Sequence, residues 1–137
     1  IMEIKNPYLT ELNKIGKSEI GYISFLQGKS DEIPFEIKRV FWTYFTPESV
    51  IRGGHAHKTT IQAIIAVSGT IIFDIQGQKE YKEIFTLDSP NKLLIIPTLY
   101  WSDIKFSHNA VLLCLASEDY DELEYIRDYN EFKNLAL

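Results

Sequence analysis

Two histidines, His55 and His57, are the residues of this sequence best suited to do chemistry. They lie in the run Arg52-Gly53-Gly54-His55-Ala56-His57-Lys58. Residues two apart on a strand point to the same face, so both imidazoles would share one pocket. Because imidazole has an ordinary pKa of about 6.5, either ring can accept or donate a proton near neutral pH. The pair predicts acid–base catalysis or substrate binding, with structural hydrogen bonding as the alternative.

The residues around the histidines argue against a metal site. Gln62 offers a neutral amide oxygen, which binds a divalent cation poorly compared with a carboxylate. Cys114 is the only cysteine; it lies in the apolar run 110–116 and is expected to be a buried, unreactive thiol. His108, in the polar stretch 106–109, is expected in a surface turn. The sequence therefore predicts no metal and no cofactor.

Three basic side chains could bind an anionic substrate. Arg52 and Lys58 flank the histidines and could bind phosphate, Arg52 through paired hydrogen bonds and Lys58 as a point charge. Either could equally be a solvated surface charge. Arg39 stands among apolar residues, and a buried guanidinium is costly unless it meets an anion, which a ligand or a protein carboxylate could supply. We expect all three to contact the substrate.

Three uncharged side chains complete the expected site. Tyr44 could contribute a catalytic hydroxyl. Trp101 could offer a flat face to the substrate, although aromatic residues in a β-barrel often fill the core. Gln62, with no metal to hold, is expected to hydrogen-bond a sugar hydroxyl or to orient a histidine.

Length and composition set the class of protein. A chain of 137 residues fits one domain, residues 1–137. The hydrophobic content of 45% and the charged content of 24% are ordinary for a globular protein, and 13% aromatic residues favours strands. A net charge of −5 argues against nucleic acid as a partner. Neither a long apolar run nor a signal-peptide pattern is present, so we expect no membrane partner and a cytoplasmic location.

Short runs rich in β-branched and aromatic residues recur along the chain, with turn residues between them. This spacing is typical of an antiparallel sandwich or barrel, and the number of strands favours a jelly roll. Only residues 120–135 read as helical or irregular. The fold class is therefore all-β, an antiparallel jelly roll with a short C-terminal helical or irregular segment. The expected strands are residues 20–26, 35–45, 61–67, 70–76, 80–86, 92–96, 103–106 and 111–116.

The strand expected within residues 37–45 carries large side chains on both faces. Neither face suits contact with solvent. We therefore expect the outer face to be covered by a second subunit, in a homodimer; the alternative is that the C-terminal segment covers it. One face has Arg39, Phe41, Thr43 and Phe45, and the other has Val40, Trp42 and Tyr44.

Four motifs, taken together, resemble a known family. The histidine run with Gln62 is similar to the first motif of cupin β-barrels, with glutamine in place of the usual glutamate. The whole set resembles the dTDP-4-oxo-6-deoxyglucose 3,4-ketoisomerases, which are small WxcM-like cupins, over about residues 21–132. The other three motifs are residues 33–40, the turn at 96–101, and 116–120 followed by 125–132.

The resemblance implies a homodimeric cupin-type jelly roll without metal. It also implies conversion of a dTDP-linked 4-keto-6-deoxy sugar into its 3-keto isomer, before an aminotransferase adds nitrogen at C3 to make dTDP-3-amino-3,6-dideoxy sugars for surface polysaccharides. The residue at the position of His55 would be the base, and His57 its active-site neighbour. Some relatives place a basic residue after the tryptophan of the turn, where this chain has Ser102, so the C4 configuration of the product stays open.

The chemistry of such an isomerisation suits these residues. The C3 hydrogen is acidic because it lies next to the C4 carbonyl, and His55 could remove it to give an enediol that is then protonated at C4. His57, Tyr44 or Arg39 would stabilise charge on the oxygens. The rival enzyme is a dTDP-sugar 3,5-epimerase, whose usual histidine and aspartate pairing is not evident in the sequence. A non-catalytic sugar-nucleotide binding module and a metal-dependent cupin oxygenase are further alternatives.

Overall fold

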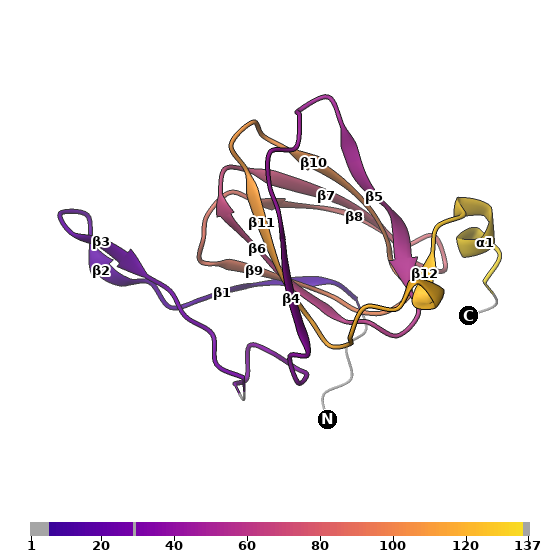
Figure 1. Ribbon diagram of the computed structural model, residues 1–137, viewed down its shortest axis with the longest axis horizontal. Coiled ribbons are helices and arrows are strands. Elements are labelled where there is room, and N and C mark those ends of the chain that lie inside the picture. The colour runs from indigo at the N-terminus through magenta and orange to yellow at the C-terminus, as the bar shows by residue number, and fades with distance from the viewer. Residues whose placement is uncertain (1–5, 29, 136–137) are drawn as a thin grey trace.

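The computed structural model describes residues 6–28 and 30–135. Most of its regular structure lies in two antiparallel five-stranded sheets that face each other (Figure 1). The strand orders are β1-β9-β6-β11-β4 and β12-β5-β10-β7-β8, and β2 and β3 form a separate hairpin. The predicted all-β class with an antiparallel jelly roll is confirmed.

The strands cover the chain from Tyr8 to Ile126. Their bounds are β1 Tyr8–Glu11, β2 Ile15–Lys17, β3 Gly21–Ile23, β4 Arg39–Thr43, β5 Ile51–His57, β6 Gln62–Ser68, β7 Ile71–Gln76, β8 Lys82–Leu87, β9 Lys92–Ile96, β10 Trp101–Phe106, β11 Val111–Ala116 and β12 Tyr125–Ile126. Strands β9 and β11 have the predicted bounds. Strands β1, β2 and β12 were not predicted, because each is too short to show an alternating pattern. The bounds of β5, the strand that carries the histidines, were not predicted either.

The C-terminal segment is mostly helical or irregular, as predicted. It contains the 3-10 helix η1 (Glu122–Glu124), the short strand β12 and the helix α1 (Tyr129–Lys133). The side chains of Asp121 and Asp128 cap the two helices by accepting hydrogen bonds from backbone N–H groups. Strand β12 pairs with β5, with Tyr125 opposite His57, so this segment is fixed beside the histidine strand.

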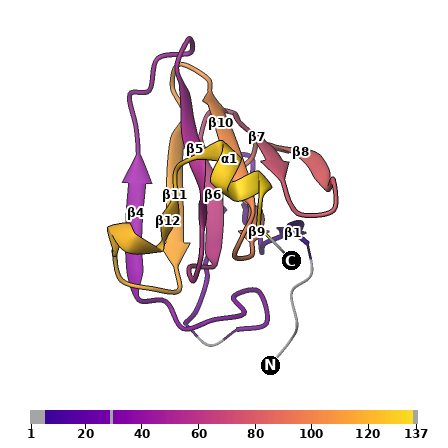
Figure 2. The same cartoon turned by 90° about the vertical axis from the view of Figure 1, so that its right-hand side faces the viewer.

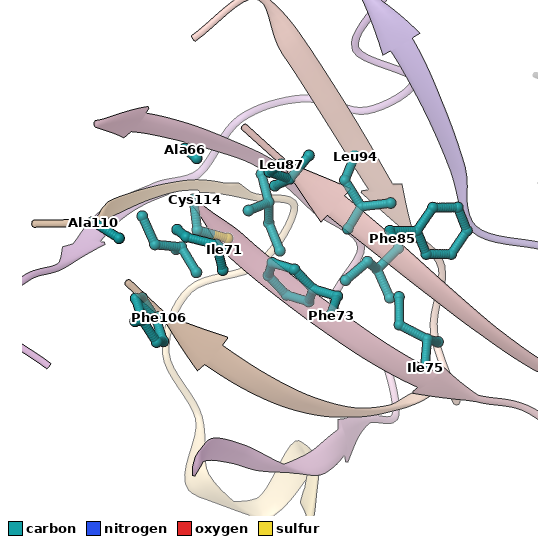
Figure 3. Packing of buried hydrophobic residues seen from close by; sticks show 13 residues of the cluster. Ala66, Ile71, Phe73, Ile75, Phe85, Leu87, Leu94, Phe106, Ala110 and Cys114 are labelled. Carbon is teal, nitrogen blue, oxygen red and sulfur yellow. The ribbon is translucent and has the colours of Figure 1, made fainter. Parts of the chain in front are cut away.

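The main core fills the space between the two sheets (Figure 3). Phe73, Ile71, Ile75 and Leu87 from β7 and β8 are fully buried there, opposite Cys114 of β11. A second apolar cluster lies on the other face of the first sheet, where Leu12 and Ile33 cover it. A third cluster joins α1 to the second sheet through Phe132, Ile126 and Trp101.

Strand β4 forms an open edge of the first sheet. Its alternation is as predicted for Arg39, Phe41 and Thr43, which point inward, and for the outer residues, of which Trp42 is 60% exposed. Phe45 departs from the prediction. It lies beyond the end of β4 in a left-handed conformation, with a φ of 58°, and it is 86% exposed.

The C-terminal segment does not cover this outer face. Helix α1 packs against β12 and β5 instead (Figure 2). The alternative to a second subunit is therefore wrong. Among the described residues, no helix is long and apolar enough to cross a membrane.

Candidate active site

A bulge in β5 places the side chains of Arg52, His55 and His57 on one face of the strand. Ser102 of β10 pairs with His55 and Asp103 pairs with Gly53, so Gly54 is an extra residue in β5. Both glycines have positive φ values, 82° and 68°. Without a bulge, residues three apart would point to opposite faces. With it, Arg52, His55 and His57 line the same cavity.

The cavity lies between the sheets and has a volume of about 420 Å³. Apolar side chains such as Ile64 and Phe73 form its inner wall. The polar groups that line it include Arg52, His55, His57, Gln62, Tyr125 and Arg127. A hollow that combines an apolar wall with several polar groups suits a polar small molecule.

His55 is a neutral imidazole. Its Nδ1 lies 3.2 Å from the carbonyl oxygen of Gly53, and because a carbonyl only accepts, Nδ1 carries the proton and Nε2 is the acceptor. Burial, followed by the charge of His57, lowers the pKa of His55 from 6.5 to about 4. His55 is therefore unprotonated, and able to act as a base, throughout the neutral range.

His57 is paired with a buried carboxylate. Its Nδ1 lies 2.5 Å from Oε1 of Glu124, and both side chains are almost fully buried. Burial lowers the pKa of His57, although the hydrogen bond and the charge of Glu124 act in the opposite direction. Nε2 of His57 is also buried and has no hydrogen-bond partner within the described part of the chain.

Glu124 is held from several sides. Its Oε1 accepts a hydrogen bond from Oγ1 of Thr60 at 2.9 Å, and its Oε2 accepts one from the backbone N–H of Thr59 at 3.2 Å. Burial alone would raise the pKa of Glu124, but the hydrogen bond and charge of His57, together with Thr59 and Thr60, hold it below its usual value. Glu124 is thus ionised and His57 donates to it.

Tyr125 and Arg127 also belong to the site. The ring of Tyr125 contacts both imidazoles, with centroid distances of 5.1 Å to His55 and 4.5 Å to His57. The guanidinium of Arg127 lies 4.4 Å from the Tyr125 ring centroid and pairs with Glu122 at 2.6 Å.

Sequence reasoning missed Glu124, Tyr125 and Arg127 as site residues. They lie 67 or more positions from His57, and no spacing rule joins a strand to a segment so far along the chain. The only signal was the resemblance of residues 125–132 to a family motif, which marked part of the segment without giving its residues a role.

Gln62 lies on the cavity wall, as expected for a substrate-binding residue. Its amide Nε2 lies 3.7 Å from Sγ of Cys114 on the neighbouring strand β11, and it donates to this sulfur. Burial raises the pKa of Cys114 to about 12, so the thiol stays protonated. The prediction of a buried thiol is confirmed.

Arg39 points inward from β4, near the histidines. Its guanidinium lies 5.3 Å from the Phe41 ring centroid and 5.6 Å from that of Tyr120. Its Nε and Nη2 are buried, and neither has a hydrogen-bond partner among residues 6–28 and 30–135. Its charge acts to lower the pKa of His57.

Besides Arg39, three predicted site residues lie outside the cavity lining. Tyr44 is 54% exposed on the outer face beyond β4. Lys58 is exposed just after β5, where its backbone N–H bonds to the carbonyl oxygen of Glu124. Trp101 is buried against Tyr129 and Phe132, in the core-filling role that was the alternative. His108 is in an exposed turn, as predicted.

The imidazoles of the lining can accept and donate protons. In the described ranges, no group of three or more histidine, cysteine, aspartate or glutamate side chains is placed to hold a metal. Two neutral imidazoles, one of them paired with a carboxylate, stand side by side with ring centroids 5.0 Å apart. An antiparallel jelly roll with such a pair in its cavity defines a cupin-type protein equipped for proton transfer.

Comparison with known proteins agrees with this class. The family model described as FdtA: WxcM-like, C-terminal matches residues 5–136. A TDP-4-oxo-6-deoxy-alpha-D-glucose-3,4-oxoisomerase from Aneurinibacillus thermoaerophilus is 38% identical over 106 residues, which are 77% of this chain and 76% of that protein.

Solved structures are similar over almost the whole chain. The WlaRB TDP-quinovose 3,4-ketoisomerase from Campylobacter jejuni has a TM-score of 0.85 and 38% identity, with 94% of this chain and 98% of that chain covered. The sugar 3,4-ketoisomerase QdtA from Thermoanaerobacterium thermosaccharolyticum, in complex with TDP, has a TM-score of 0.86 and 34% identity, with 95% and 93% covered. The chain belongs to the WxcM-like family of sugar 3,4-ketoisomerases, as its motifs predicted.

Proposed function

We propose that this protein converts a dTDP-linked 4-keto-6-deoxy sugar into its 3-keto isomer in the cavity between the sheets. The observation that carries the proposal is a neutral His55 beside the His57–Glu124 pair on the wall of that cavity. Similarity supports the substrate class: a histidine-to-asparagine mutant of QdtA, 33% identical to this chain, was solved in complex with TDP-4-keto-6-deoxyglucose.

His55 is the proposed base. Its Nε2 takes the proton from C3, which is acidic because the C4 carbonyl can accept the electron pair. The C3–H electrons form the C3–C4 double bond of an enediolate. The hydroxyl proton on the C3 oxygen passes to the C4 oxygen, and the protonated His55 then donates its proton to C4 as the carbonyl forms at C3. The nearby positive charge of Arg39 and Arg127 favours the negatively charged intermediate.

The remaining polar groups are proposed to hold the substrate. Arg52 lies at the cavity with its side chain exposed, which suits a diphosphate. Gln62 has an amide oxygen that can accept from a sugar hydroxyl while its Nε2 donates to Cys114. Arg39 has two buried nitrogens that a substrate oxygen could satisfy. Tyr44, Lys58 and Trp101 have no role in the cavity of a single chain.

The downstream use of the product is proposed on chemical grounds. A 3-keto sugar carries its carbonyl where an amine can be introduced by transamination, so the product suits synthesis of dTDP-3-amino-3,6-dideoxy sugars for surface polysaccharides. An aminotransferase that accepts the product in a coupled reaction would support this use.

Replacing the base tests the function directly. The His55→Asn protein should lose deuterium exchange at C3 and slow isomerisation of dTDP-4-keto-6-deoxyglucose by at least about 10²-fold, because removal of a general base commonly costs that much. NMR of the sugar measures both. The matched control is His108→Asn, in an exposed turn, which should react at the native rate.

Other outcomes of that assay would redirect the assignment. A His55→Asn protein with native turnover would contradict the base assignment, and a His57→Asn variant would then show whether the second imidazole is the base. The pairing of His57 with Glu124 makes the 3,5-epimerase an alternative to test. The same NMR spectra test it, because epimerisation changes the configuration at C3 and C5 and leaves the ketone at C4. Binding of the sugar nucleotide with no turnover would indicate a non-catalytic binding module.

We also propose that the protein is a homodimer. Val40, Trp42 and Tyr44 are 48%, 60% and 54% exposed along the edge strand β4 and the loop beyond it. Beside this edge, the outer face of the first sheet has an apolar hollow of about 640 Å³, lined by residues such as Ile65, Val67 and Leu113.

A hairpin stands next to this hollow. Strands β2 and β3 pair mainly with each other and project from the body (Figure 1), with Ile15, Ile20 and Ile23 more than half exposed. A second copy could cover the hollow and the hairpin together, since each face supplies apolar surface that the single chain leaves in water.

A further inference from the structure

The guanidinium of Arg127 lines the cavity but is held from outside it by a carboxylate. Arg127 Nε donates to Oε1 of Glu122 at 2.6 Å, and Nη2 donates to Oε2 at 3.0 Å. This two-point contact uses two of the five N–H donors of a guanidinium. Nη1 has no hydrogen bond to a residue that the structure describes, so three donors are left for a molecule in the cavity.

Glu122 is itself fixed in place. Its Oε2 also accepts a hydrogen bond from the hydroxyl of Tyr120 at 2.6 Å. The hydrogen bond from Arg127, followed by that from Tyr120, lowers the pKa of Glu122 to about 2. Glu122 is therefore a carboxylate throughout the neutral range and keeps its contact with Arg127.

Tyr125 fixes the face of the same guanidinium. The Cζ atom of Arg127 lies 4.4 Å from the Tyr125 ring centroid. The backbone of Tyr125 is held in β12, opposite His57 of β5. With a carboxylate at its edge and a ring at its face, an arginine that is half exposed has one preferred orientation at the cavity.

Such an arrangement favours binding of an anion. An exposed arginine loses rotamer freedom when a ligand immobilises it, and that loss weakens binding. A guanidinium that is already fixed avoids most of the loss. A diphosphate offers several charged oxygens, which suit paired N–H donors. Arg52, which is also exposed at the cavity, approaches the same space from β5.

We propose that Glu122 is a positioning residue, which holds the Arg127 guanidinium against Tyr125 so that its remaining N–H donors bind the diphosphate of the sugar nucleotide. The proposal rests on the proposed ketoisomerase function. Glu122 does not touch the substrate; it acts through Arg127, and Tyr120 supports it.

Two roles of Glu122 predict opposite results. If Glu122 were only a negative charge near the diphosphate, it would repel the ligand, and its removal would tighten binding. If it positions Arg127, its removal weakens binding, because the ligand must then immobilise a mobile side chain.

The Glu122→Ala variant distinguishes the two roles. Its dissociation constant for TDP, measured by isothermal titration calorimetry, should rise about 3- to 10-fold. Thymidine, which lacks the diphosphate, should bind as tightly as to the native protein. KM for dTDP-4-keto-6-deoxyglucose should rise by the same factor while kcat changes much less, because the diphosphate contact is the same before and during proton transfer. Tighter or unchanged binding of TDP would overturn the proposal.

A matched control removes the same charge from the same part of the chain. Glu118 pairs with Lys38 at 3.3 Å, and neither side chain lines the cavity. The Glu118→Ala variant should bind TDP and thymidine with native affinity.

A double-mutant cycle tests whether Glu122 acts through Arg127. Arg127→Ala should weaken TDP binding, and adding Glu122→Ala to it should have no further effect. An equal loss on adding Glu122→Ala to either background would contradict the proposal, since Glu122 would then act by another route.

A measurement on the native protein needs no variant to fold. In ¹H–¹⁵N NMR spectra, the Nη signals of Arg127 should shift on titration with TDP and stay in place with thymidine. Signals unmoved by saturating TDP would overturn the proposal. A native protein that binds TDP but does not isomerise the sugar would contradict the proposed function, whereas the dissociation constants would still decide the role of Glu122.

Discussion

At His55 the nearest polar neighbour is a backbone carbonyl, whereas at His57 it is a buried carboxylate. The carbonyl of Gly53 orients the His55 ring without adding a full charge, so burial dominates and the pKa falls to about 4. Glu124 opposes burial at His57. Two identical side chains two residues apart are thereby given different environments, so different groups set their pKa values.

The low pKa of His55 predicts an unusual pH dependence. We expect kcat/KM to stay level as the pH falls through 6.5 and to decline with an apparent pKa of about 4, because only then does the base become protonated. Rates measured with saturating and subsaturating substrate across this range, with circular dichroism at each pH, check the expectation. An acidic limb centred at 6.5 would contradict it.

The same shift affects stability in a definite direction. Below pH 6.5 His55 becomes protonated in the unfolded chain, whereas in the folded protein it stays neutral until the pH reaches about 4. The contribution of His55 to the free energy of unfolding is therefore present above 6.5 and is lost as the pH falls to about 4. Loss of fold in acid must be separated from loss of activity for this reason.

Individual site residues were predictable where local spacing carried the signal. His55 and His57 were singled out because strand alternation puts residues two apart on one face. Gln62 was singled out because it stands where the similar cupin motif has a glutamate. Glu124 was not, because its partner is 67 positions away and only the pairing of β12 with β5 brings the two together. Arg39 was predicted because its neighbours in the sequence are apolar and burying a charged side chain among them is costly.

At the scale of elements, the β5 bulge decides which residues reach the cavity. A Cβ at position 53 would lie 2.5 Å from the backbone oxygen of Ser102, and the residue has a φ of 82°. Gly53 is therefore required both for the close approach of β10 and for the left-handed backbone. The sequence shows two adjacent glycines, but it does not show that the backbone of Ser102 on the neighbouring strand packs against Gly53.

Substituting this glycine should weaken the fold and the site together. We expect Gly53→Ala to lower the free energy of unfolding by about 1–3 kcal/mol or more, because the alanine is both strained and in contact with backbone. Urea unfolding measures the change.

A matched substitution serves as the control. Gly28→Ala should have little effect, since a Cβ there meets no atom within 4 Å. Equal stabilities of the two variants would contradict the assigned role of the bulge.

At the scale of the whole molecule, the proposed dimer gives a prediction about association. Val40→Lys should weaken the dimer by at least about 100-fold, because the variant places a charge where apolar surface is to be buried. Sedimentation equilibrium measures the dissociation constant. Ile84→Lys, at an isoleucine 65% exposed on β8 of the other sheet, is the matched control. A monomeric native protein would contradict the dimer.

The overall architecture was predictable because alternation and turn residues recur throughout the chain. Burial follows period two along β7, and the turn that follows is closed by a hydrogen bond from the backbone N–H of Gly77 to the carbonyl oxygen of Tyr81. Strand β3 lies within the expected strand 20–26, but its partner β2 was not predicted, because it has three residues and contains Gly16. The single domain and the cytoplasmic location stay predictions.

The complete burial of Cys114 beneath the site has a practical consequence. The chain has one sulfhydryl, it is inaccessible in the core, and its high pKa keeps it from becoming the reactive anion. Alkylating reagents and peroxide can reach it only after the two sheets part. The protein should therefore stay active when it is handled in air without reducing agents. Labelling of this sulfur would report the fraction of molecules that have unfolded.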